Sequence, residues 1–309
     1  MVTRRTAGSA HSGIGSAGVD LGVELCGIRL ATPLVPAAGT LAKEALDMAK
    51  GVYGAILPKT VTPEARSGNP PPRLAEAPSG MVNSIGLQNP GLQRFLEDLD
   101  DYLDYGLPLF VSVAADTVKE FAAMCERLAS EAPEKVAAVE LNLSCPNVEH
   151  GGLQFCATPS AVAEVVAVCR DALPDKPLFA KLTNEGVVAN AVSAEEAGAS
   201  ALTLVNTIPA LVVDPRERKV FLRGGLSGSA IKPIALRAVY EVSRVVEVPV
   251  IGCGGVTSGT DVAEFMLAGA TAVQIGAGSF VREPLEILEE FVAYLNESGL
   301  RARGLTGLL

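Results

Sequence analysis

Cys145 is the residue of this sequence whose position most strongly suggests chemistry. It lies in the segment Asn142-Leu-Ser-Cys-Pro-Asn147, directly after an apolar run, and its neighbours are polar. A cysteine used only for packing is expected on an apolar helical face, where Cys125 and Cys169 lie. A thiol in a polar turn at the end of a strand is better placed for proton transfer or nucleophilic attack.

A Cys–His hydrolase is the competing interpretation of Cys145. The chain has 2 histidines, and His11 lies in the N-terminal stretch, which leaves His150 as the possible partner. No strand-end Asp or Asn is spaced to orient His150 as a catalytic triad requires. The sequence therefore favours a base over a hydrolytic nucleophile.

Lysines and asparagines follow other apolar runs. Lys59 and Lys181 each end such a run, and Asn142 and the pair Asn206-Thr207 stand at the ends of two more. A strand-end lysine can simply extend into solvent. Two lysines at one mouth would instead supply fixed positive charge to an anionic ligand, and we favour that interpretation.

Glycine turns follow the last two apolar runs, at Gly254-Gly255 and at Gly276-Ala277-Gly278, and each precedes a predicted helix. Glycines can serve only to make tight turns. At the last two strands of a barrel, however, such turns and the following helix N-terminus commonly bind a phosphate group. Gly228, before another predicted helix, is expected to add further backbone donors.

The elements that must position these residues repeat one theme. Apolar, β-branched runs are bounded by Gly, Pro, Asn or Ser, and helical patterns lie between most of them. The runs are residues 34–37, 53–57, 107–113, 137–143, 177–182, 201–205, 248–251 and 272–275. Strand and helix in alternation predict an α/β fold with a parallel sheet, and eight units of this size predict a (β/α)8 TIM barrel. A doubly wound open sheet is the alternative.

Three further segments complete the organisation. Residues 19–35 alternate as a β-hairpin does, and two long connections, 59–106 and 207–229, are expected to be functional loops, lids or disordered. Residues 1–18 are rich in Gly, Ser and Ala, which predicts a disordered tail. We therefore expect one domain, residues 19–309, that holds the whole site.

Composition narrows the possible partners. The net charge of -10 opposes binding to nucleic acid or to an anionic membrane surface. No apolar stretch is long enough to span a membrane, and the 6 cysteines form no disulfide framework, so we expect a cytoplasmic protein. The strand ends lack a cluster of His, Asp or Glu, which predicts no metal site.

At this point the motifs resemble those of the class 1 dihydroorotate dehydrogenases, and most closely the class 1B branch. The similar segments run in family order across nearly the whole chain after the tail. They are Pro58-Lys-Thr-Val-Thr62, Gly68-Asn-Pro-Pro-Pro-Arg73, Asn83-Ser-Ile-Gly-Leu-Gln-Asn89, Asn142-Leu-Ser-Cys-Pro-Asn147 with His150-Gly-Gly152, Gly224-Gly-Leu-Ser-Gly228 and Ile251-Gly-Cys-Gly-Gly255.

The resemblance implies one FMN per chain, held in the strand-end mouth with dihydroorotate stacked on the flavin. It assigns substrate binding to Lys59, Asn83, Ser84, Ile85, Gly86, Leu87, Asn142, Asn147, Asn206 and Thr207. It assigns cofactor binding to Ala38, Gly39, Lys59, Thr60, Ser112, Asn142, Lys181, Val205, Gly228, Gly254, Gly255, Gly276 and Ala277. Amide side chains suit the donors and acceptors of a pyrimidine ring, and a lysine suits its carboxylate.

The resemblance also implies a reaction, the oxidation of (S)-dihydroorotate to orotate in the de novo synthesis of UMP. Cys145 is expected to remove a proton from C5 while hydride passes from C6 to flavin N5. Lys181 is expected to stabilise the negative charge gained near flavin N1 and the C2 carbonyl.

Class 1B relatives pass electrons to a second subunit that carries FAD and a [2Fe-2S] cluster and uses NAD+. The resemblance therefore implies a homodimer joined to such a subunit in a heterotetramer, with FAD and the cluster only on the partner. Fumarate, the acceptor in class 1A, is the alternative. Class 2 relatives use a Ser base and an N-terminal membrane helix, and this chain shows neither feature.

Two features depart from the family pattern, and two other functions compete. Ser112 stands where the third strand usually offers an Asn to the flavin, and Cys156 replaces an expected glycine. The first rival is a dihydropyrimidine dehydrogenase, whose relatives resemble Cys-Pro-His where this chain has Asn147 after Pro146. The second is a catalytically silent flavin-binding subunit, which the joint presence of Lys59, Cys145 and Lys181 disfavours.

Overall fold

Parallel strands form the centre of the fold, and the computed structural model describes residues 19–144 and 153–309. Seven of them make one curved sheet in the order β3-β13-β12-β9-β8-β7-β6. In chain order these strands are β3 (Leu34–Pro36), β6 (Phe110–Val113), β7 (Ala138–Asn142), β8 (Leu178–Leu182), β9 (Ala201–Leu204), β12 (Val250–Cys253) and β13 (Ala270–Ile275). Nearly every residue in them is buried, which explains why the sequence shows continuous apolar runs there.

Residues 53–57 close this sheet between β3 and β6. The Gly54 N–H donates to the carbonyl of Leu34 at 2.8 Å, and the Ile56 N–H donates to the carbonyl of Pro108 at 2.9 Å. A parallel bridge also joins Ile56 to Leu109. All eight predicted runs therefore take part in one closed barrel. The predicted (β/α)8 fold is confirmed, and the open doubly wound sheet is wrong.

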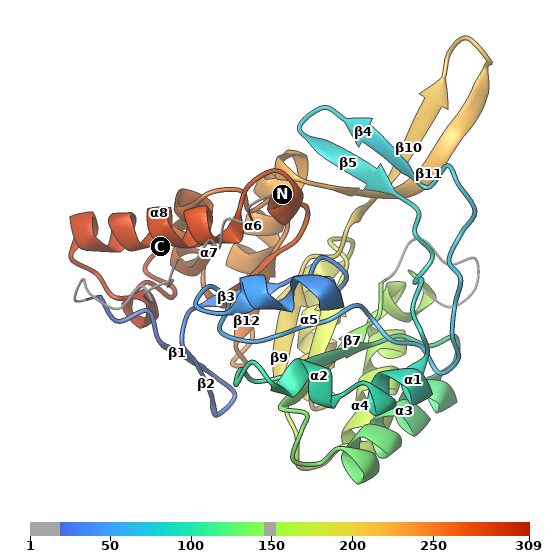
Figure 1. Ribbon diagram of the computed structural model, residues 1–309, viewed down its shortest axis with the longest axis horizontal. Helices are drawn as coiled ribbons and strands as arrows, with labels where there is room; N and C mark the ends of the chain where they lie inside the picture. Colours follow the sequence, from blue (N-terminus) through green and yellow to red (C-terminus); the bar gives the residue numbers. More distant parts are fainter. Residues whose placement is uncertain (1–18, 145–152) are drawn as a thin grey trace, which may run out of the picture.

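Helices surround the barrel on its outside (Figure 1). The main ones are α3 (Val118–Glu131), α4 (Pro159–Ala172), α5 (Val187–Glu196), α6 (Lys232–Val242), α7 (Gly259–Leu267) and α8 (Pro284–Ser298), with the short α1 (Leu92–Glu97) and α2 (Asp100–Leu103) before β6. Short 3-10 turns are η1 (Lys43–Ala49), η2 (Leu153–Cys156), η3 (Ser229–Ile231), η4 (Ala277–Phe280) and η5 (Ala302–Gly304).

Local side chains decide where several helices begin. The Thr117 hydroxyl accepts from the backbone N–H of Glu120, and the Glu120 carboxylate accepts from the N–H of Thr117, which is a capping box at the start of α3. Thr158 and Ser258 cap α4 and α7 in the same manner through their hydroxyl oxygens. These caps satisfy backbone donors that the first helical turn leaves without partners.

A two-stranded hairpin lies under the amino ends of the barrel strands. It pairs β1 (Val23–Leu25) with β2 (Ile28–Leu30), as the alternation in residues 19–35 predicts. At its turn the Cys26 thiol donates to the carbonyl of Ser200, which directly precedes β9. The hairpin thus covers the end of the barrel opposite the predicted site.

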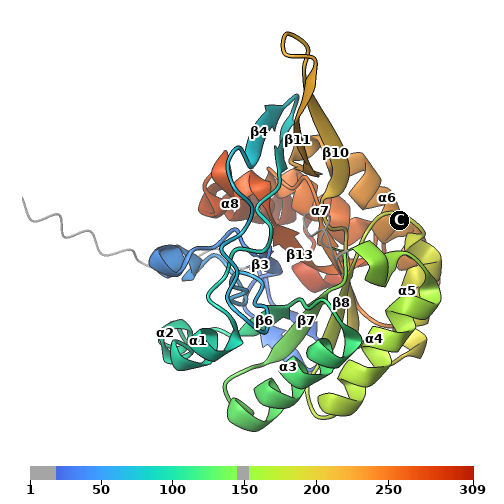
Figure 2. The ribbon, with the colours of Figure 1, turned by 90° about the vertical axis from the view of Figure 1, so that its right-hand side faces the viewer.

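A second, antiparallel sheet projects from the barrel at its other end (Figures 1 and 2). Its strand order is β10-β11-β5-β4, with bounds β4 Leu74–Ala77, β5 Gly80–Asn83, β10 Ile208–Asp214 and β11 Lys219–Ser227. These strands come from the two long connections, which we expected to be loops, lids or disordered segments. That expectation needs correction, because β5 pairs with β11 across 142 positions, for example Asn83 with Gly225, and local sequence patterns do not reveal such pairing. The predicted tail, residues 1–18, lies outside the described residues.

Candidate active site

A cavity of about 530 Å³ lies at the carboxyl ends of the barrel strands, beside the antiparallel sheet. This is the end of a (β/α)8 barrel where chemistry is placed, and the volume suits a cofactor or a substrate. The predicted site residues that line it are Ala38, Gly39, Lys59, Thr60, Asn83, Ile85, Gly86, Leu87, Asn142, Lys181, Val205, Asn206, Thr207, Gly228, Gly254, Gly255, Gly276 and Ala277.

Some predicted residues do not line this cavity, and some lining residues escaped prediction. Ser84 and Ser112 do not line it, while Cys145 and Asn147 belong to residues 145–152, outside the described part of the chain. The lining residues to which the sequence assigned no binding role are Ala37, Thr40, Leu74, Met81, Ser227, Ile231, Cys253 and Phe280. Ala37, Thr40, Ser227 and Cys253 are next to predicted residues in the chain, whereas Leu74 and Met81 reach the cavity because the antiparallel sheet lies beside it.

Glycine turns form one wall of the cavity. Gly254 and Gly255 follow β12 with φ angles of +129° and +80°, in the region that favours glycine. A Cβ on Gly255 would lie 2.7 Å from the backbone nitrogen of Lys232, so the backbone there has no room for a side chain. Gly228 and Gly276 precede η3 and η4 at the same wall. Backbone amides of such glycine turns can approach a bound phosphate group closely, so this wall is a suitable phosphate cradle.

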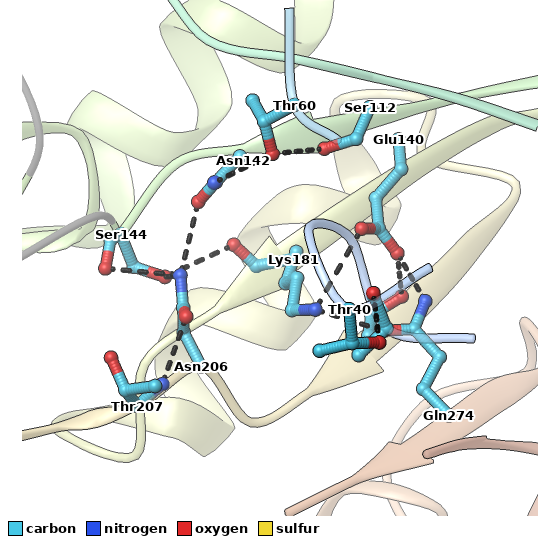
Figure 3. A network of polar contacts seen from close by, with 12 residues as sticks. Thr40, Thr60, Ser112, Glu140, Asn142, Ser144, Lys181, Asn206, Thr207 and Gln274 are labelled. Atoms are coloured by element: carbon cyan, nitrogen blue, oxygen red, sulfur yellow. Dashed lines mark hydrogen bonds and ion pairs between the residues drawn. The ribbon is translucent and has the colours of Figure 1, made fainter. Parts of the chain in front are cut away.

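Polar side chains at the ends of four barrel strands form a connected belt (Figure 3). The amide nitrogen of Asn206, after β9, donates to Oδ1 of Asn142 at 3.0 Å. The amide of Asn142, at the end of β7, donates to the Thr60 hydroxyl at 3.4 Å, and that hydroxyl pairs with Ser112 at 2.9 Å. The belt holds the Asn142 amide in one orientation, which is the geometry needed to recognise a ring with alternating donors and acceptors.

Ser112 therefore reaches the cavity only through Thr60. The hydroxyl of Ser112 is buried, and it is committed to Thr60. Its assignment to the cofactor stays a prediction. The contacts indicate that Ser112 would act indirectly, by orienting Thr60 and through it Asn142.

Lys181 is the buried cation of the site. Its ammonium donates to Oε1 of Gln274 at 2.8 Å and lies 3.8 Å from Oε1 of Glu140 (Figure 3). Burial opposes the charged form, but the Cys253 sulfur and the Glu140 carboxylate favour it, and the net effect is a pKa for Lys181 above the ordinary lysine value. The ammonium is thus a fixed positive charge at the base of the cavity.

Lys59 is the second cation, and it faces the cavity from residues after the second strand. It is exposed there, yet the surrounding protein withdraws part of its water, and Arg73 lies close enough to add repulsion. Both effects lower the pKa of Lys59 from its ordinary value, desolvation more than the charge of Arg73. The two predicted lysines therefore do converge on one cavity, in different electrostatic environments.

Sequence reasoning missed Glu140 and Gln274. Glu140 is fully buried inside the barrel, and Gln274 is 1% exposed. The available signal was a charged residue within the apolar run 137–143, two positions before Asn142 and so on the same inward face of the strand.

Within residues 19–144 and 153–309, no three His, Cys, Asp or Glu side chains are grouped so that they could hold a metal ion. None of the helices in these ranges has the length and apolar character needed to cross a membrane.

The fold and the cavity together define a (β/α)8-barrel protein with its ligand site at the carboxyl ends of the strands. Residues 20–297 match the sequence profile of the dihydroorotate dehydrogenase family. The chain belongs to this family.

Individual relatives agree with the family match. The chain is 44% identical over 290 residues to the catalytic subunit of dihydroorotate dehydrogenase B (NAD(+)) from Anoxybacillus flavithermus, covering 90% of this chain and 92% of that protein. It is 42% identical to the same subunit from Geotalea uraniireducens, covering 91% and 95%. A crystal structure of the Eimeria tenella enzyme in complex with ferulenol superimposes with a TM-score of 0.79 at 23% identity, covering 96% of this chain and 90% of that one, which supports the fold.

Proposed function

We propose that this chain is the catalytic subunit of an FMN-dependent dihydroorotate dehydrogenase of the NAD+-linked type, acting in pyrimidine biosynthesis. One observation carries the proposal: two lysines, an asparagine belt and the glycine turns after the last two strands converge on one cavity. Two further findings support it: the chain belongs to the dihydroorotate dehydrogenase family, and it aligns with most of the length of relatives named as catalytic subunits of dihydroorotate dehydrogenase B (NAD(+)).

The residues present fit an FMN group. The glycine turns bring backbone amides to the cavity wall where a phosphate would lie, and at Gly255 the neighbouring backbone of Lys232 and Gly228 leaves no room for a side chain. Lys181 supplies a buried positive charge, and Thr60 and Asn142 supply hydrogen-bonding groups along the wall. We assign the phosphate to Gly228, Gly254, Gly255, Gly276 and Ala277. When bound, the flavin supplies the acceptor for the hydride that leaves the substrate.

The chain's own residues would bind and deprotonate the substrate. Lys59 pairs with the carboxylate of dihydroorotate, and the amides of Asn142 and Asn206 recognise the polar edge of its ring. Cys145 takes the proton from C5, and Lys181 supplies positive charge where electron density gathers in the ring system beside it. Ser84, Asn147 and the other substrate residues named from the sequence complete this assignment.

The partner is part of the same proposal. Leu74 and Phe280 both line the cavity and are 51% and 60% exposed, and Val281 beside Phe280 is 73% exposed. An apolar rim at the mouth of a redox site suits a protein partner. We propose that a subunit carrying FAD and a [2Fe-2S] cluster docks there and delivers electrons to NAD+, within a heterotetramer built on a homodimer of this chain in the cytoplasm.

Anaerobic mixing with dihydroorotate tests the activity directly. The yellow FMN-loaded chain should lose its visible absorbance within seconds, and dihydrouracil, which lacks the carboxylate, should leave it yellow. Rapid bleaching by dihydrouracil but not by dihydroorotate would point to the dihydropyrimidine alternative, and bleaching by neither would point to the silent subunit. NAD+ should be reduced only when the partner subunit is present.

A further inference from the structure

Glu140 is a buried acid that the proposed reaction does not use. It lies on β7 two residues before Asn142, so both side chains face the interior of the barrel, with Glu140 one layer deeper. Its side chain is fully buried. Burial of an isolated carboxyl group is costly unless hydrogen bonds or an opposite charge compensate for it, so the surroundings of Glu140 indicate its role.

One carboxyl oxygen of Glu140 is held by neutral donors. Oε2 accepts from the Thr203 hydroxyl at 2.8 Å and from the Gln274 amide at 2.6 Å. The other oxygen, Oε1, has no hydrogen-bond partner among the described residues. The Gln274 amide nitrogen beside Oε2 and the Lys181 ammonium beside Oε1 can only donate, so neither could accept a proton from a neutral carboxyl group. The arrangement therefore fits the charged carboxylate.

The free oxygen faces Lys181. Glu140 Oε1 lies 3.8 Å from Lys181 Nζ, beyond hydrogen-bond distance but close enough for a strong charge interaction in a water-poor interior. Gln274 bridges the pair, because its carbonyl oxygen accepts from Lys181 while its amide nitrogen donates to Glu140 (Figure 3). The carboxylate thus attracts the ammonium from the interior of the barrel. The opposite side of the ammonium faces the cavity, which Lys181 lines.

We propose that Glu140 is a positioning residue for the flavin site, acting as the countercharge that keeps Lys181 protonated and held at the base of the cavity. The inference rests on the proposed FMN site for its consequence: the charge on Lys181 favours electron density at the adjoining end of the flavin. Without Glu140, a lysine this deeply buried would readily lose its proton near neutral pH.

The groups around Lys181 leave Glu140 as its only nearby acid within the described residues. Glu140 faces it from β7 and Cys253 from β12, while β9 and β13 contribute Thr203 and Gln274, which do not titrate. Lys59 lines the same cavity and adds positive charge. The Cys253 sulfur also favours charged Lys181, but burial raises the pKa of this thiol and so favours its neutral form, which leaves Glu140 as the carboxylate that supplies a full negative charge.

Sulfite binding to the FMN-loaded chain measures this charge without relying on turnover. Sulfite adds to the flavin ring and bleaches it, and its affinity rises with positive charge beside the ring. We would measure the ratio of the sulfite dissociation constant of Glu140→Gln to that of wild type from about pH 6 to pH 9. We expect this ratio to rise by about tenfold or more across the range and to level off at the value of Lys181→Met, because Lys181 loses its proton.

Matched variants separate charge from structure. Glu264→Gln removes a carboxylate from Lys232 outside the cavity and should give a flat ratio. Glu140→Asp keeps the charge farther from Lys181 and should move the rise to higher pH. The double variant Glu140→Gln with Lys181→Met should show no pH-dependent rise. A pH-independent ratio for Glu140→Gln, or a rise that persists in the double variant, would overturn the proposal.

Unfolding of the flavin-free chain tests the same pair independently of FMN binding. Each single variant leaves one buried group without its partner, so the urea midpoint of the double variant should fall by less than the sum of the falls in Glu140→Gln and Lys181→Met. Additive losses would contradict the pairing. If wild type binds no FMN, the proposed function is wrong, but the unfolding measurements still show whether Glu140 and Lys181 interact.

Discussion

Asn206 donates its side-chain amide to Oδ1 of Asn142 at 3.0 Å, joining the ends of β9 and β7 across the mouth of the barrel. The same Asn206 Oδ1 accepts from the backbone N–H of Thr207 at 2.8 Å, so the whole amide is fixed. This contact orients the two asparagines that we assign to the substrate ring.

Asn206→Ala should therefore weaken orotate binding beyond the loss of one contact. Asn142 loses its fixed orientation together with the direct interaction, and we expect the orotate dissociation constant to rise by about tenfold or more. Titration of the flavin absorbance with orotate measures this. Asn296→Ala, at an exposed position of α8, is the control and should bind orotate as wild type does. Equal affinities in all three proteins would remove Asn206 from the site.

Cys145→Ala should keep FMN and orotate binding and lose the proton-transfer step. A positioned general base is worth a factor of about 10² to 10⁴, so anaerobic reduction by dihydroorotate should slow by that factor. Stopped-flow bleaching measures the rate. Cys26→Ser serves as control, because its thiol lies at the opposite end of the barrel and burial raises its pKa to about 11. Bleaching of Cys145→Ala at the wild-type rate would rule out this thiol as the base.

Orotate binding should weaken at alkaline pH because Lys59 loses its positive charge there. Its pKa is lowered by desolvation and by Arg73, so its positive charge is present at low pH and lost as pH rises through a value below that of an ordinary lysine. Orotate affinity should weaken over that alkaline window. Lys59→Arg stays charged throughout, so it should retain its affinity across the same pH range. Orotate titrations of both proteins from about pH 7 to pH 10 would decide, since a parallel loss in the arginine variant would assign the limit to another group.

Gly255→Ala should impair FMN binding, because a Cβ there must displace the backbone that forms the cradle. The new Cβ would lie 2.7 Å from the Lys232 nitrogen in the cradle, and the positive φ adds strain of about 1–2 kcal/mol. We expect FMN affinity to fall at least about tenfold, measured by quenching of flavin fluorescence. Gly106→Ala has a similar positive φ of +66° with open space around it, so it isolates the strain. Equal FMN affinities in the two variants would mean that Gly255 forms no cradle.

The sequence by itself determined the repeated strand–helix pattern of this protein and which polar residues follow its strands. In a covered parallel sheet each strand is apolar throughout, so the eight runs stand out, and the polar residue after each run must emerge at the same end of the barrel. That reasoning was enough to place Lys59, Asn142, Lys181 and Asn206 on one cavity, and their motifs were enough to indicate the family.

Only the tertiary structure showed what lies beneath and beside those residues. Glu140 meets Lys181 and Gln274 only after the barrel closes, because inward side chains of strands far apart in sequence share one layer. The antiparallel sheet likewise depends on β5 pairing with β11, which no local periodicity specifies. Sequence patterns describe neighbours along the chain, whereas the charge held on Lys181 is set by neighbours across the barrel.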